Sequence, residues 1–384
     1  MQVAIVGAGI GGLTAGLLLR RGGHDVTIFE QAPELEAVGA GIQLGPNAIS
    51  VLEHAGLGPA LRDAAVFVDW IEGRDWTTGK EIYRLEYARG GDPVYGAPFY
   101  DCHRAELQTM MVDAVGVDHL RLDHRLSRVE TRPGGATLVF EHGDELDFDA
   151  VIGADGIHSS VRSSVFGNAP ARFSGMVAYR GTIGPEDAAD LPLTNNAVKW
   201  WGPTPSHHFV AYALGDGSLN CVGVVPESRW LSDSWTELGD VASLRKAFEG
   251  FADPVGEILE RVETTFRWAL YDREVSVPWA RGNVALLGDA CHAMLPFMAQ
   301  GAGQAIEDAA ILSRVMGPEG RGTTENRLTA YETLRRPRAS AVHEQSRANL
   351  LFSKDTANLD TYDLYAYRAM SAPLLGASRE GTSA

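Results

Sequence analysis

The sequence is poor in cysteine and in positive charge, and it has no long apolar run. Its three cysteines, Cys102, Cys221 and Cys291, are far apart and odd in number, which argues against a disulfide framework or a metal site. We therefore expect no metal and a reduced, cytoplasmic protein. No segment approaches the roughly 18 consecutive apolar residues of a membrane-spanning helix. No basic leader precedes the first predicted strand, so neither a membrane location nor secretion is expected.

The charge balance limits the partners that the protein can bind. The formal net charge is -17 at pH 7, whereas nucleic acids and anionic membrane surfaces favour a basic face. We therefore expect neither of them as a partner. An anionic small molecule is still compatible with this charge, because a few local arginines outweigh a distant net charge.

The length of 384 residues exceeds what one ordinary hydrophobic core accommodates, so we expect two domains or one domain with a large insertion. Apolar residues make up 45% of the sequence and charged residues 22%. This balance is typical of a compact globular protein.

The N-terminal segment predicts a βαβ unit. Residues 3–6 form a short apolar run that ends in glycine, as a buried parallel strand does. Residues 13–21 contain helix formers with an apolar face, and a glycine pair ends this helix. Residues 26–29 form a second apolar run, which Glu30 follows directly.

Three glycines connect the first predicted strand to the helix. Gly7, Gly9 and Gly12 form the pattern G-x-G-x-x-G. The first permits a tight turn, the second lets the backbone approach a pyrophosphate, and the third lets the helix pack against the strand. The phosphates would lie at the helix N-terminus, where free N–H groups attract anions. Glu30 stands 18 residues after Gly12 and would accept ribose hydroxyls, so the sequence predicts a dinucleotide site.

Two further apolar strands run into glycine-containing turns. Residues 150–153 precede Asp155 in ADGIHSSVR, and residues 283–287 precede Asp289 in GDACHAMLPFMAQGAGQAIEDAAIL. The second half of the longer segment predicts an amphipathic helix. Because ligands bind at the carboxyl edge of open α/β sheets, we expect both turns at that edge, beside the glycine loop.

The composition changes between residues 173 and 271. There, β-branched and aromatic residues alternate with Gly, Pro, Asn and Asp, which predicts an antiparallel sheet. From about residue 331 onward the sequence is predicted to be mostly helical, and its last residues, GASREGTSA, are predicted to be disordered.

The predicted fold class is α/β, with a Rossmann-like dinucleotide-binding domain, an inserted and mainly antiparallel β-sheet substrate domain, and C-terminal helices. The predicted boundaries are 1–70, 100–172 and 272–350 for the first domain, 71–99 and 173–271 for the second, and 351–384 for a C-terminal helical tail.

The three turn motifs, taken in this order, resemble the fingerprint set of the single-component FAD-dependent aromatic hydroxylases, over essentially the whole chain. Within that family the sequence is most similar to the salicylate hydroxylase, 3-hydroxybenzoate 6-hydroxylase and 6-hydroxynicotinate 3-monooxygenase branch. The segments that carry this likeness are GAGIQLGPN at 39–47, VAYRG at 177–181, the pair His208 and Tyr212, YDRE at 271–274, and the glycine-rich segment from Gly288.

The resemblance implies an FAD-dependent monooxygenase that uses NADH or NADPH and O2. Such an enzyme hydroxylates a phenolic or heteroaromatic ring through a flavin C4a-hydroperoxide, in some cases with loss of a carboxylate. Only one G-x-G-x-x-G is present, so the resemblance implies that NAD(P)H binds transiently, without a Rossmann site of its own.

The resemblance also implies which residues contact FAD. The ADP half would be held by the glycine loop with Glu30 and Gln31, the pyrophosphate by Arg104, and the ribityl chain by the turn around Asp289. Backbone N–H groups at the start of the following helix would face the flavin pyrimidine. The predicted cofactor-binding set is Gly7, Gly9, Gly12, Glu30, Gln31, Arg104, Asp155, Asp289, Pro296, Gly301 and Ala302.

His208 and Tyr212 are the predicted catalytic residues. They are four residues apart in a strand-like stretch, so both side chains would point to one face of a sheet. A histidine and a tyrosine together can bind and deprotonate a phenolic hydroxyl, which activates the ring toward electrophilic attack. The alternative is a hydrogen-bonded core tyrosine and an edge histidine. His207 is adjacent, and the sequence leaves open which histidine faces the pocket.

Four residues are predicted to line the substrate pocket, namely Gln43, Arg180, Trp201 and Phe297. Arg180 could pair with a substrate carboxylate or serve the fold. Gln43 and Phe297 stand where 6-hydroxynicotinate enzymes of the family have histidines, and Pro296 stands where the 3-hydroxybenzoate branch has a glutamine. The substrate is therefore open between a hydroxybenzoate, a hydroxypyridine carboxylate and a larger phenolic metabolite.

Other functions compete with this interpretation. A flavoprotein oxidase or dehydrogenase would need no NAD(P)H, and a flavin carrier would show no turnover. A flavin halogenase would require a W-x-W-x-x-P pattern, which the sequence lacks. A monomer or a homodimer is expected on base rates.

Overall fold

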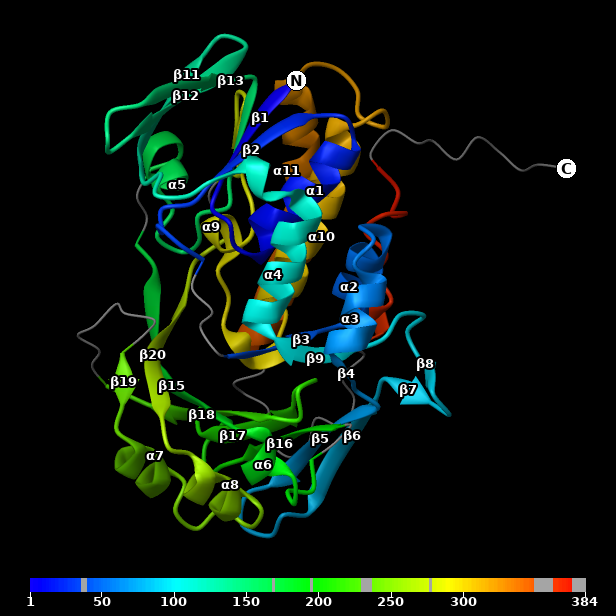
Figure 1. Ribbon diagram of the computed structural model, residues 1–384, viewed down its shortest axis with the longest axis vertical. Coiled ribbons are helices and arrows are strands. Elements are labelled where there is room, and N and C mark those ends of the chain that lie inside the picture. Colours follow the sequence, from blue (N-terminus) through cyan, green and yellow to red (C-terminus); the bar gives the residue numbers. More distant parts are fainter. Residues whose placement is uncertain are drawn as a thin grey trace, which may run out of the picture.

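The computed structural model describes residues 1–35, 40–167, 170–193, 196–228, 237–275, 278–348 and 362–374. In Figure 1 the molecule has an upper part, in which helices and a small sheet flank a mostly parallel sheet, and a lower part built on a larger sheet. The chain crosses between the two parts several times, so each part combines segments that are far apart in the sequence.

A six-stranded sheet forms the centre of the upper part, in the order β10-β2-β1-β14-β22-β21. Neighbouring strands are parallel except for the last pair. The predicted βαβ unit and the predicted strands at residues 150–153 and 283–287 are confirmed. The bounds are β1 Gln2–Val6, β2 Asp25–Phe29, β10 Leu120–Arg121, β14 Ala150–Gly153, β21 Ala280–Arg281 and β22 Val284–Leu286.

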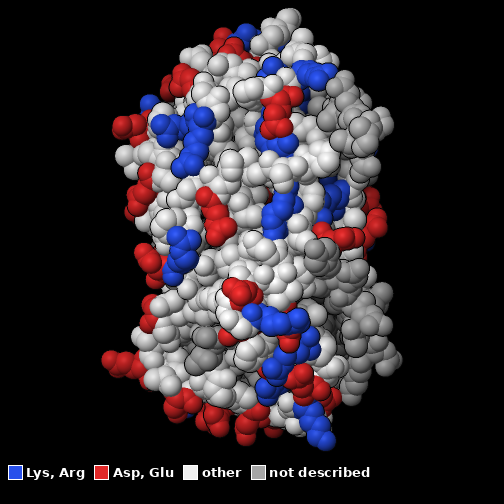
Figure 2. All heavy atoms as spheres, turned by 90° about the vertical axis from the view of Figure 1, so that its right-hand side faces the viewer, with Lys and Arg blue, Asp and Glu red and all other residues white. Residues whose placement is uncertain are grey.

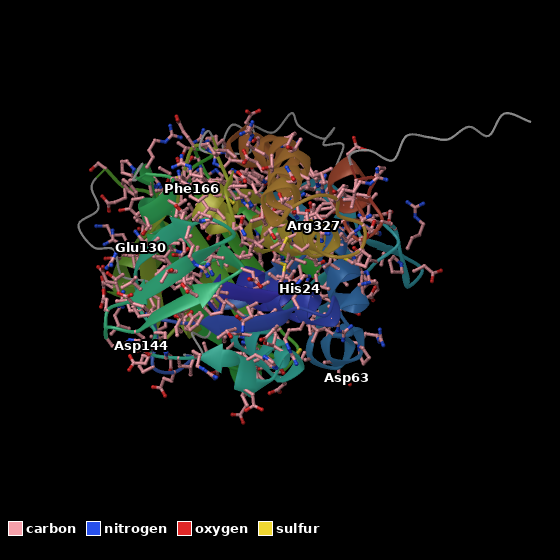
Figure 3. All side chains as sticks on the ribbon, turned by 90° about the horizontal axis from the view of Figure 1, so that it is seen from above. His24, Asp63, Glu130, Asp144, Phe166 and Arg327 are labelled. Atoms are coloured by element: carbon pink, nitrogen blue, oxygen red, sulfur yellow. The ribbon has the colours of Figure 1, made fainter. Side chains whose placement is uncertain are left out.

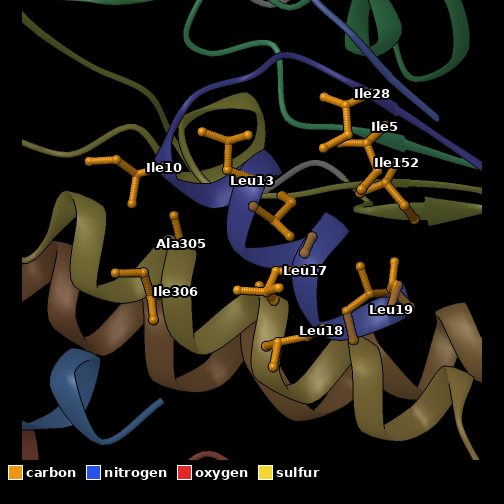
Figure 4. Packing of buried hydrophobic residues seen from close by; sticks show 14 of the residues in the cluster. Ile5, Ile10, Leu13, Leu17, Leu18, Leu19, Ile28, Ile152, Ala305 and Ile306 are labelled. Carbon is orange, nitrogen blue, oxygen red and sulfur yellow. The ribbon is translucent and has the colours of Figure 1, made fainter. Parts of the chain in front are cut away.

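Helices cover one face of this sheet and a small antiparallel sheet covers the other. From above, the labelled Glu130 and Asp144 mark the small sheet, and Arg327 lies on the helical side (Figure 3). Helix α1 packs between Ile5 of the parallel sheet and Ile306 of α10 (Figure 4). The bounds are α1 Ile10–Arg21, α4 Arg104–Val115, α10 Gly301–Met316, α11 Thr324–Ala348, β11 Leu126–Arg132, β12 Gly135–Phe140 and β13 Glu145–Phe148.

The lower part is an eight-stranded sheet in the order β19-β20-β15-β18-β17-β16-β5-β6. It is antiparallel, as predicted, except that β16 and β5 are parallel. Parallel neighbours need a long connection, and these two strands are far apart in the sequence. The bounds are β5 Trp70–Asp75, β6 Glu81–Glu86, β15 Arg172–Ile183, β16 Asn196–Trp201, β17 His208–Ala213, β18 Leu219–Pro226, β19 Leu238–Gly239 and β20 Thr265–Asp272.

Side chains alternate between the two faces of this sheet. On the outer face, Trp200, Phe209 and Cys221 pack in one cluster with Phe248, which follows α7. The alternate positions therefore face the upper part of the molecule. The outer helices have the bounds α6 Pro185–Ala188, α7 Val241–Ala247 and α8 Val255–Arg261.

Short elements join the two parts. The bounds are β3 Gly41–Leu44, β4 Val66–Phe67, β9 Tyr100–His103, β7 Ala88–Arg89, β8 Asp92–Pro93, α2 Pro46–His54, α3 Gly58–Ala64, α5 Ser160–Val165, α9 Asp289–His292 and α12 Tyr362–Tyr365, with 3-10 turns η1 Val117–His119 and η2 Pro296–Met298. The predicted C-terminal helicity is confirmed by α11, which begins earlier than expected and continues through Pro337. Residues 351–361 and 375–384 of the predicted tail, the predicted disordered end among them, lie outside the described residues.

In the described part of the chain, no helix is both long enough and apolar enough to cross a bilayer. Acidic and basic side chains intermingle on the face shown in Figure 2, and acidic side chains line its lower edge.

Candidate active site

The glycine loop between β1 and α1 has the geometry of a phosphate cradle. Gly7 has a φ of +105°, and a Cβ there would lie 2.4 Å from the Ala154 carbonyl oxygen. A Cβ on Gly12 would lie 2.0 Å from the Gly7 carbonyl oxygen, so this glycine lets helix and strand approach closely. Around Gly9, by contrast, a Cβ would meet nothing within 4 Å. Open space at the N-terminus of α1 is where a pyrophosphate fits.

Glu30 follows β2 and faces the glycine loop. Its carboxylate accepts hydrogen bonds from the backbone N–H of Ala8 (2.9 Å) and of Ala32 (3.0 Å). These contacts hold the side chain beside the loop and leave it partly exposed. Gln31 is next in the chain and exposed. Both positions suit contacts with the adenosine end of a dinucleotide.

Arg104 and Asp289 come from opposite ends of the sequence and lie in one cleft. Arg104 begins α4 and Asp289 begins α9, and their charges interact favourably. Both side chains are accessible to solvent, yet burial among protein atoms raises the pKa of Asp289. Solvent therefore reaches both groups, although protein atoms surround them. Together they offer a cation that can bind phosphates and a carboxylate that can accept a hydrogen bond from a hydroxyl.

The second predicted motif forms a capped turn after β14. Asp155 accepts hydrogen bonds from the Ser159 hydroxyl (2.5 Å) and from the backbone N–H of Val161 (3.1 Å). Its carboxylate therefore fixes its own turn, and burial raises its pKa. Any contact of this segment with FAD or with the nicotinamide donor would come from the polar atoms of the turn that are not bonded to Asp155.

The third predicted motif is the loop that enters α10. It contains η2, which begins at Pro296, and then Ala299 with a φ of +52°. Helix α10 begins at Gly301, followed by Ala302. A Cβ on Gly301 would meet nothing within 4 Å. The unpaired N–H groups of this helix N-terminus therefore face open space, as a flavin pyrimidine requires.

A buried ion-pair network that the sequence analysis did not single out supports this loop. Arg335 of α11 lies with Nη1 2.7 Å from Glu307 Oε2 and with Nε 2.7 Å from Asp308 Oδ1, and all three side chains are fully buried. Burial opposes ionisation of both carboxyls, but nearby positive charge outweighs it and lowers both pKa values: chiefly that of Arg335 for Glu307, and that of His292 followed by Arg335 for Asp308. The signal in the sequence is an adjacent Glu-Asp pair inside an otherwise apolar helix.

Asp308 connects this network to the flavin-side turn. Its Oδ2 accepts a hydrogen bond from the backbone N–H of Gly288 (3.0 Å) and lies 2.6 Å from His292 Nε2. Cys291, His292 and Asp308 have potential ligand atoms within 4.8 Å of one another, but Cys291 Sγ donates to the Gly288 carbonyl oxygen (3.3 Å). These contacts indicate a hydrogen-bonded support that positions Asp289.

The inner face of the lower sheet turns toward η2. His208 pairs with Trp201 on the neighbouring strand. Tyr212 lies four residues further along β17, so its side chain points to the same face. The His208 ring centroid lies 5.3 Å from that of Phe297 of η2 and 5.7 Å from that of Trp201. His207 packs instead against Phe248 on the outer side (4.9 Å). The histidine that faces the upper part is therefore His208, a choice that the sequence left open.

His208 and Tyr212 keep one polar atom each for a ligand. His208 Nδ1 lies 3.3 Å from the Pro205 carbonyl oxygen, so the neutral ring donates there and presents Nε2 as an acceptor. Burial, followed by the charge of Lys199, lowers the pKa of His208 well below its usual range. Burial raises the pKa of Tyr212, which keeps its hydroxyl protonated. Among the described residues, neither His208 Nε2 nor the Tyr212 hydroxyl has a hydrogen-bond partner.

Two other predicted pocket residues differ in their contacts: Gln43 is hydrogen-bonded within the protein, whereas Arg180 packs on an aromatic ring and its Nε is buried without a hydrogen-bond partner among the described residues. Gln43 Nε2 donates to Asp101 Oδ1 (3.1 Å), and burial raises the pKa of Asp101 well above its usual range. The Arg180 guanidinium lies 4.1 Å from the Trp268 ring centroid, and burial lowers its pKa to about 10. Arg180 interacts electrostatically with Tyr212 and with Arg104, so it lies within reach of both.

The loops and the network together define a flavin-dependent oxidoreductase. The model of the family described as "FAD binding domain" matches residues 1–346, and the chain belongs to this family. It is 37% identical to the 3-amino-4-hydroxybenzoate 2-monooxygenase of Streptomyces cremeus over 90% of this chain and 86% of that protein. It is 34% identical to the 6-hydroxynicotinate 3-monooxygenase of Bordetella bronchiseptica over 95% of this chain and 96% of that protein.

Solved structures show the same architecture. Klebsiella pneumoniae HpxO, complexed with FAD and uric acid, has a TM-score of 0.81 at 27% identity, covering 95% of this chain and 92% of that chain. The predicted fold class, family branch and cofactor are therefore confirmed. The protein is an FAD-dependent aromatic monooxygenase with NAD(P)H as co-substrate. Bound FAD, once reduced, supplies the oxygen activation, and the protein supplies binding, orientation and electrostatics.

Proposed function

We propose that this enzyme hydroxylates a small phenolic acid of the hydroxybenzoate type. The ring would lie between η2 and the inner face of the lower sheet, with its hydroxyl toward His208 and Tyr212. One observation carries the proposal: His208 Nε2 and the Tyr212 hydroxyl belong to buried side chains on one sheet face and have no hydrogen-bond partner among the described residues. Neither atom is itself closed off from solvent, so both are free to bind a polar group of a ligand that enters this space.

In this proposal His208 accepts the hydrogen bond of the substrate hydroxyl. As the neutral acceptor it draws the proton from the hydroxyl, and the Tyr212 hydroxyl donates to the same oxygen and stabilises its developing charge. The ring becomes richer in electrons at the carbon that is attacked. Phe297 and Trp201 would form apolar walls that keep water from the reacting groups.

The cofactor-side assignments follow from the cavity geometry. We propose that Glu30 and Gln31 bind the adenosine end, that Arg104 binds the pyrophosphate, and that Asp289 accepts a ribityl hydroxyl. The N–H groups at Gly301 and Ala302, the first residues of α10, would face the pyrimidine. The division into an FAD-binding domain and a substrate domain, with residues 71–99 in the second, is likewise proposed. The membership of β5 and β6 in the eight-stranded sheet supports it.

The relatives support the substrate class. Both have names that specify a ring with a hydroxyl and a carboxylate, on benzene in one and on pyridine in the other. Gln43 and Phe297 replace the histidines of the pyridine branch, and Gln43 is hydrogen-bonded to Asp101. These differences favour a benzoate over a pyridine substrate. A monomer or homodimer and a cytoplasmic location remain predictions.

The test is NADH and NADPH oxidation in air with a panel of hydroxybenzoates, aminohydroxybenzoates and hydroxypyridine carboxylates, with product and peroxide measured together. We expect an aminohydroxybenzoate or hydroxybenzoate to accelerate oxidation and to be hydroxylated. His208→Gln and Tyr212→Phe should reduce product formation while FAD stays bound. If stimulated oxidation ends entirely in peroxide for every compound, the natural substrate is a larger phenolic metabolite and the proposal is wrong.

A further inference from the structure

Lys199 is a buried cation on the same sheet face as His208. It lies two residues before Trp201 on β16, so both side chains point to the inner face. Its Nζ lies 3.8 Å from the Trp201 ring centroid and 5.6 Å from that of Phe297. The side chain is 8% exposed. The ammonium position is therefore enclosed by the aromatic walls of the proposed pocket.

No anion in the described part of the chain compensates this cation. Lys199 has no ion pair or hydrogen bond there, and burial alone lowers its pKa, to about 7. The carboxylate of Glu72, on the adjacent strand, is bonded to Arg74 and Arg84 instead. Buried lysines are rare unless paired, so the missing partner is the unusual feature.

The choice of lysine is informative in this chain. The sequence contains only four lysines, at positions 80, 199, 246 and 354, and uses arginine almost everywhere else. Arginine stays charged when buried, whereas lysine can lose its proton and regain it. At this position a lysine can be neutral in the free enzyme and become an ammonium when an anion enters.

We propose that Lys199 binds the carboxylate of the aromatic substrate as an ammonium, while His208 and Tyr212 bind its hydroxyl. Lys199 and His208 are diagonal cross-strand neighbours, about 7–8 Å apart, and one substituted benzene ring can bridge two such groups. This assignment rests on the proposed function and adds the residue that selects an anionic substrate. Arg180 is the competing partner, but Lys199 lies on the strand next to His208, whereas Arg180 lies two strands away from it.

A pH dependence of binding follows. Among the described residues, the other titratable side chains near Lys199 on this face are His208, whose pKa lies well below its usual range, and Tyr83 and Tyr212, whose pKa values are raised. Between about pH 6 and 9 these groups stay neutral. A carboxylate therefore binds with proton uptake by Lys199, and its affinity falls as the pH rises above about 7.

The experiment compares 3-amino-4-hydroxybenzoate with its carboxamide on the FAD-loaded enzyme. Dissociation constants come from the change in the flavin spectrum, and proton uptake comes from calorimetry in buffers with different ionisation enthalpies. The variants are Lys199→Met, Lys199→Arg and Arg180→Gln. Lys246→Met, on the exposed face of α7, is the matched control.

The wild type should bind the carboxylate about 10- to 100-fold more tightly than the amide, the range of a charge-assisted hydrogen bond. Lys199→Met should abolish this preference and the proton uptake. Lys199→Arg should keep the preference and lose the pH dependence. Lys246→Met should behave as the wild type does.

Equal binding of acid and amide by the wild type overturns the assignment, and so does a preference that survives in Lys199→Met or disappears only in Arg180→Gln. Lys199→Met removes a buried charge at nearly constant volume, so it should fold; its thermal unfolding checks this.

Turnover is a separate measurement. A Lys199-dependent preference without product contradicts the proposed function alone, whereas equal KM values for acid and amide with normal product contradict only the role of Lys199.

Discussion

Replacing Gly12 with alanine should destabilise the protein even without FAD. The added Cβ would lie 2.0 Å from the Gly7 carbonyl oxygen and 3.3 Å from the Ala154 Cβ. The first contact is with backbone and is more than 1 Å too short, so α1 would have to move away from β1. Overpacking of this kind costs about 1–3 kcal/mol or more. FAD affinity should also fall, because the moved helix N-terminus no longer meets the phosphates.

Gly9→Ala is the matched control within the same loop. Its φ of -73° suits alanine, and the new Cβ meets nothing within 4 Å. Stability without FAD should therefore stay within about 1 kcal/mol of the wild type. The methyl group would nevertheless occupy the space proposed for the pyrophosphate. If that overlap costs about 1–3 kcal/mol, FAD should bind about 5- to 150-fold more weakly.

The two variants are compared by urea unfolding of the FAD-free protein and by titration of FAD fluorescence. The expected pattern is a loss of stability in Gly12→Ala only, with weaker FAD binding in both. An unchanged unfolding midpoint in Gly12→Ala refutes the close helix–strand contact. Wild-type FAD affinity in Gly9→Ala refutes the placement of the pyrophosphate.

Three further predictions concern the buried network and the sheet face. Arg335→Met should lower the free energy of unfolding by up to about 3–5 kcal/mol because it removes the buried cation that Glu307 and Asp308 share, after which Glu307 relies on Arg338 and Asp308 on His292. Arg336→Met, at an exposed pair, should change it by less than about 1 kcal/mol; urea unfolding measures both. The folded-state pKa values of Glu307 and Asp308 lie below their ordinary values of 4.5 and 3.8. The two ionised carboxylates therefore stabilise the folded protein fully at pH values above these ordinary pKa values, and this contribution is lost as the pH falls through the folded-state pKa values. The urea midpoint should already decline between about pH 7 and 5, because unfolding lets buried histidines such as His208 take up protons. It should fall further below about pH 4, and the absence of this further fall at pH 3 would contradict the lowered pKa values of Glu307 and Asp308. His208→Ala should reduce kcat by about 10²- to 10⁴-fold with FAD affinity unchanged, and single-turnover rates close to wild type would exclude His208 as the acceptor.

Much of the cofactor side was predictable because its constraints are local in sequence. A tight turn, a close helix–strand contact and an open approach to phosphate each require glycine at a fixed offset, so Gly7, Gly9 and Gly12 are recognisable without a structure. The alternation of side chains along a strand is equally local, and it predicted that His208 and Tyr212 lie on one face of the sheet. The family resemblance then connected these signals to FAD, which the comparisons confirmed.

The network under the flavin-side loop could not be predicted in this way. Glu307 and Asp308 are adjacent in the sequence, but their partner Arg335 lies on another helix, and only helix packing brings them together. The sequence does not distinguish a buried charged residue from a solvent-exposed one, because burial depends on the whole fold. The same reason explains why Asp155, which the sequence assigned to the cofactor, is engaged within its own turn.

Residues a few positions apart predicted a dinucleotide site and the alternation of side chains along each strand, and the family resemblance added FAD. Only the tertiary structure placed His208, not His207, on the inner face, and placed Lys199 beside it without a counter-ion in the described part of the chain. Those outcomes depend on which strands pair and which face is covered, and strand pairing joins segments such as β5 and β16 that are more than a hundred residues apart.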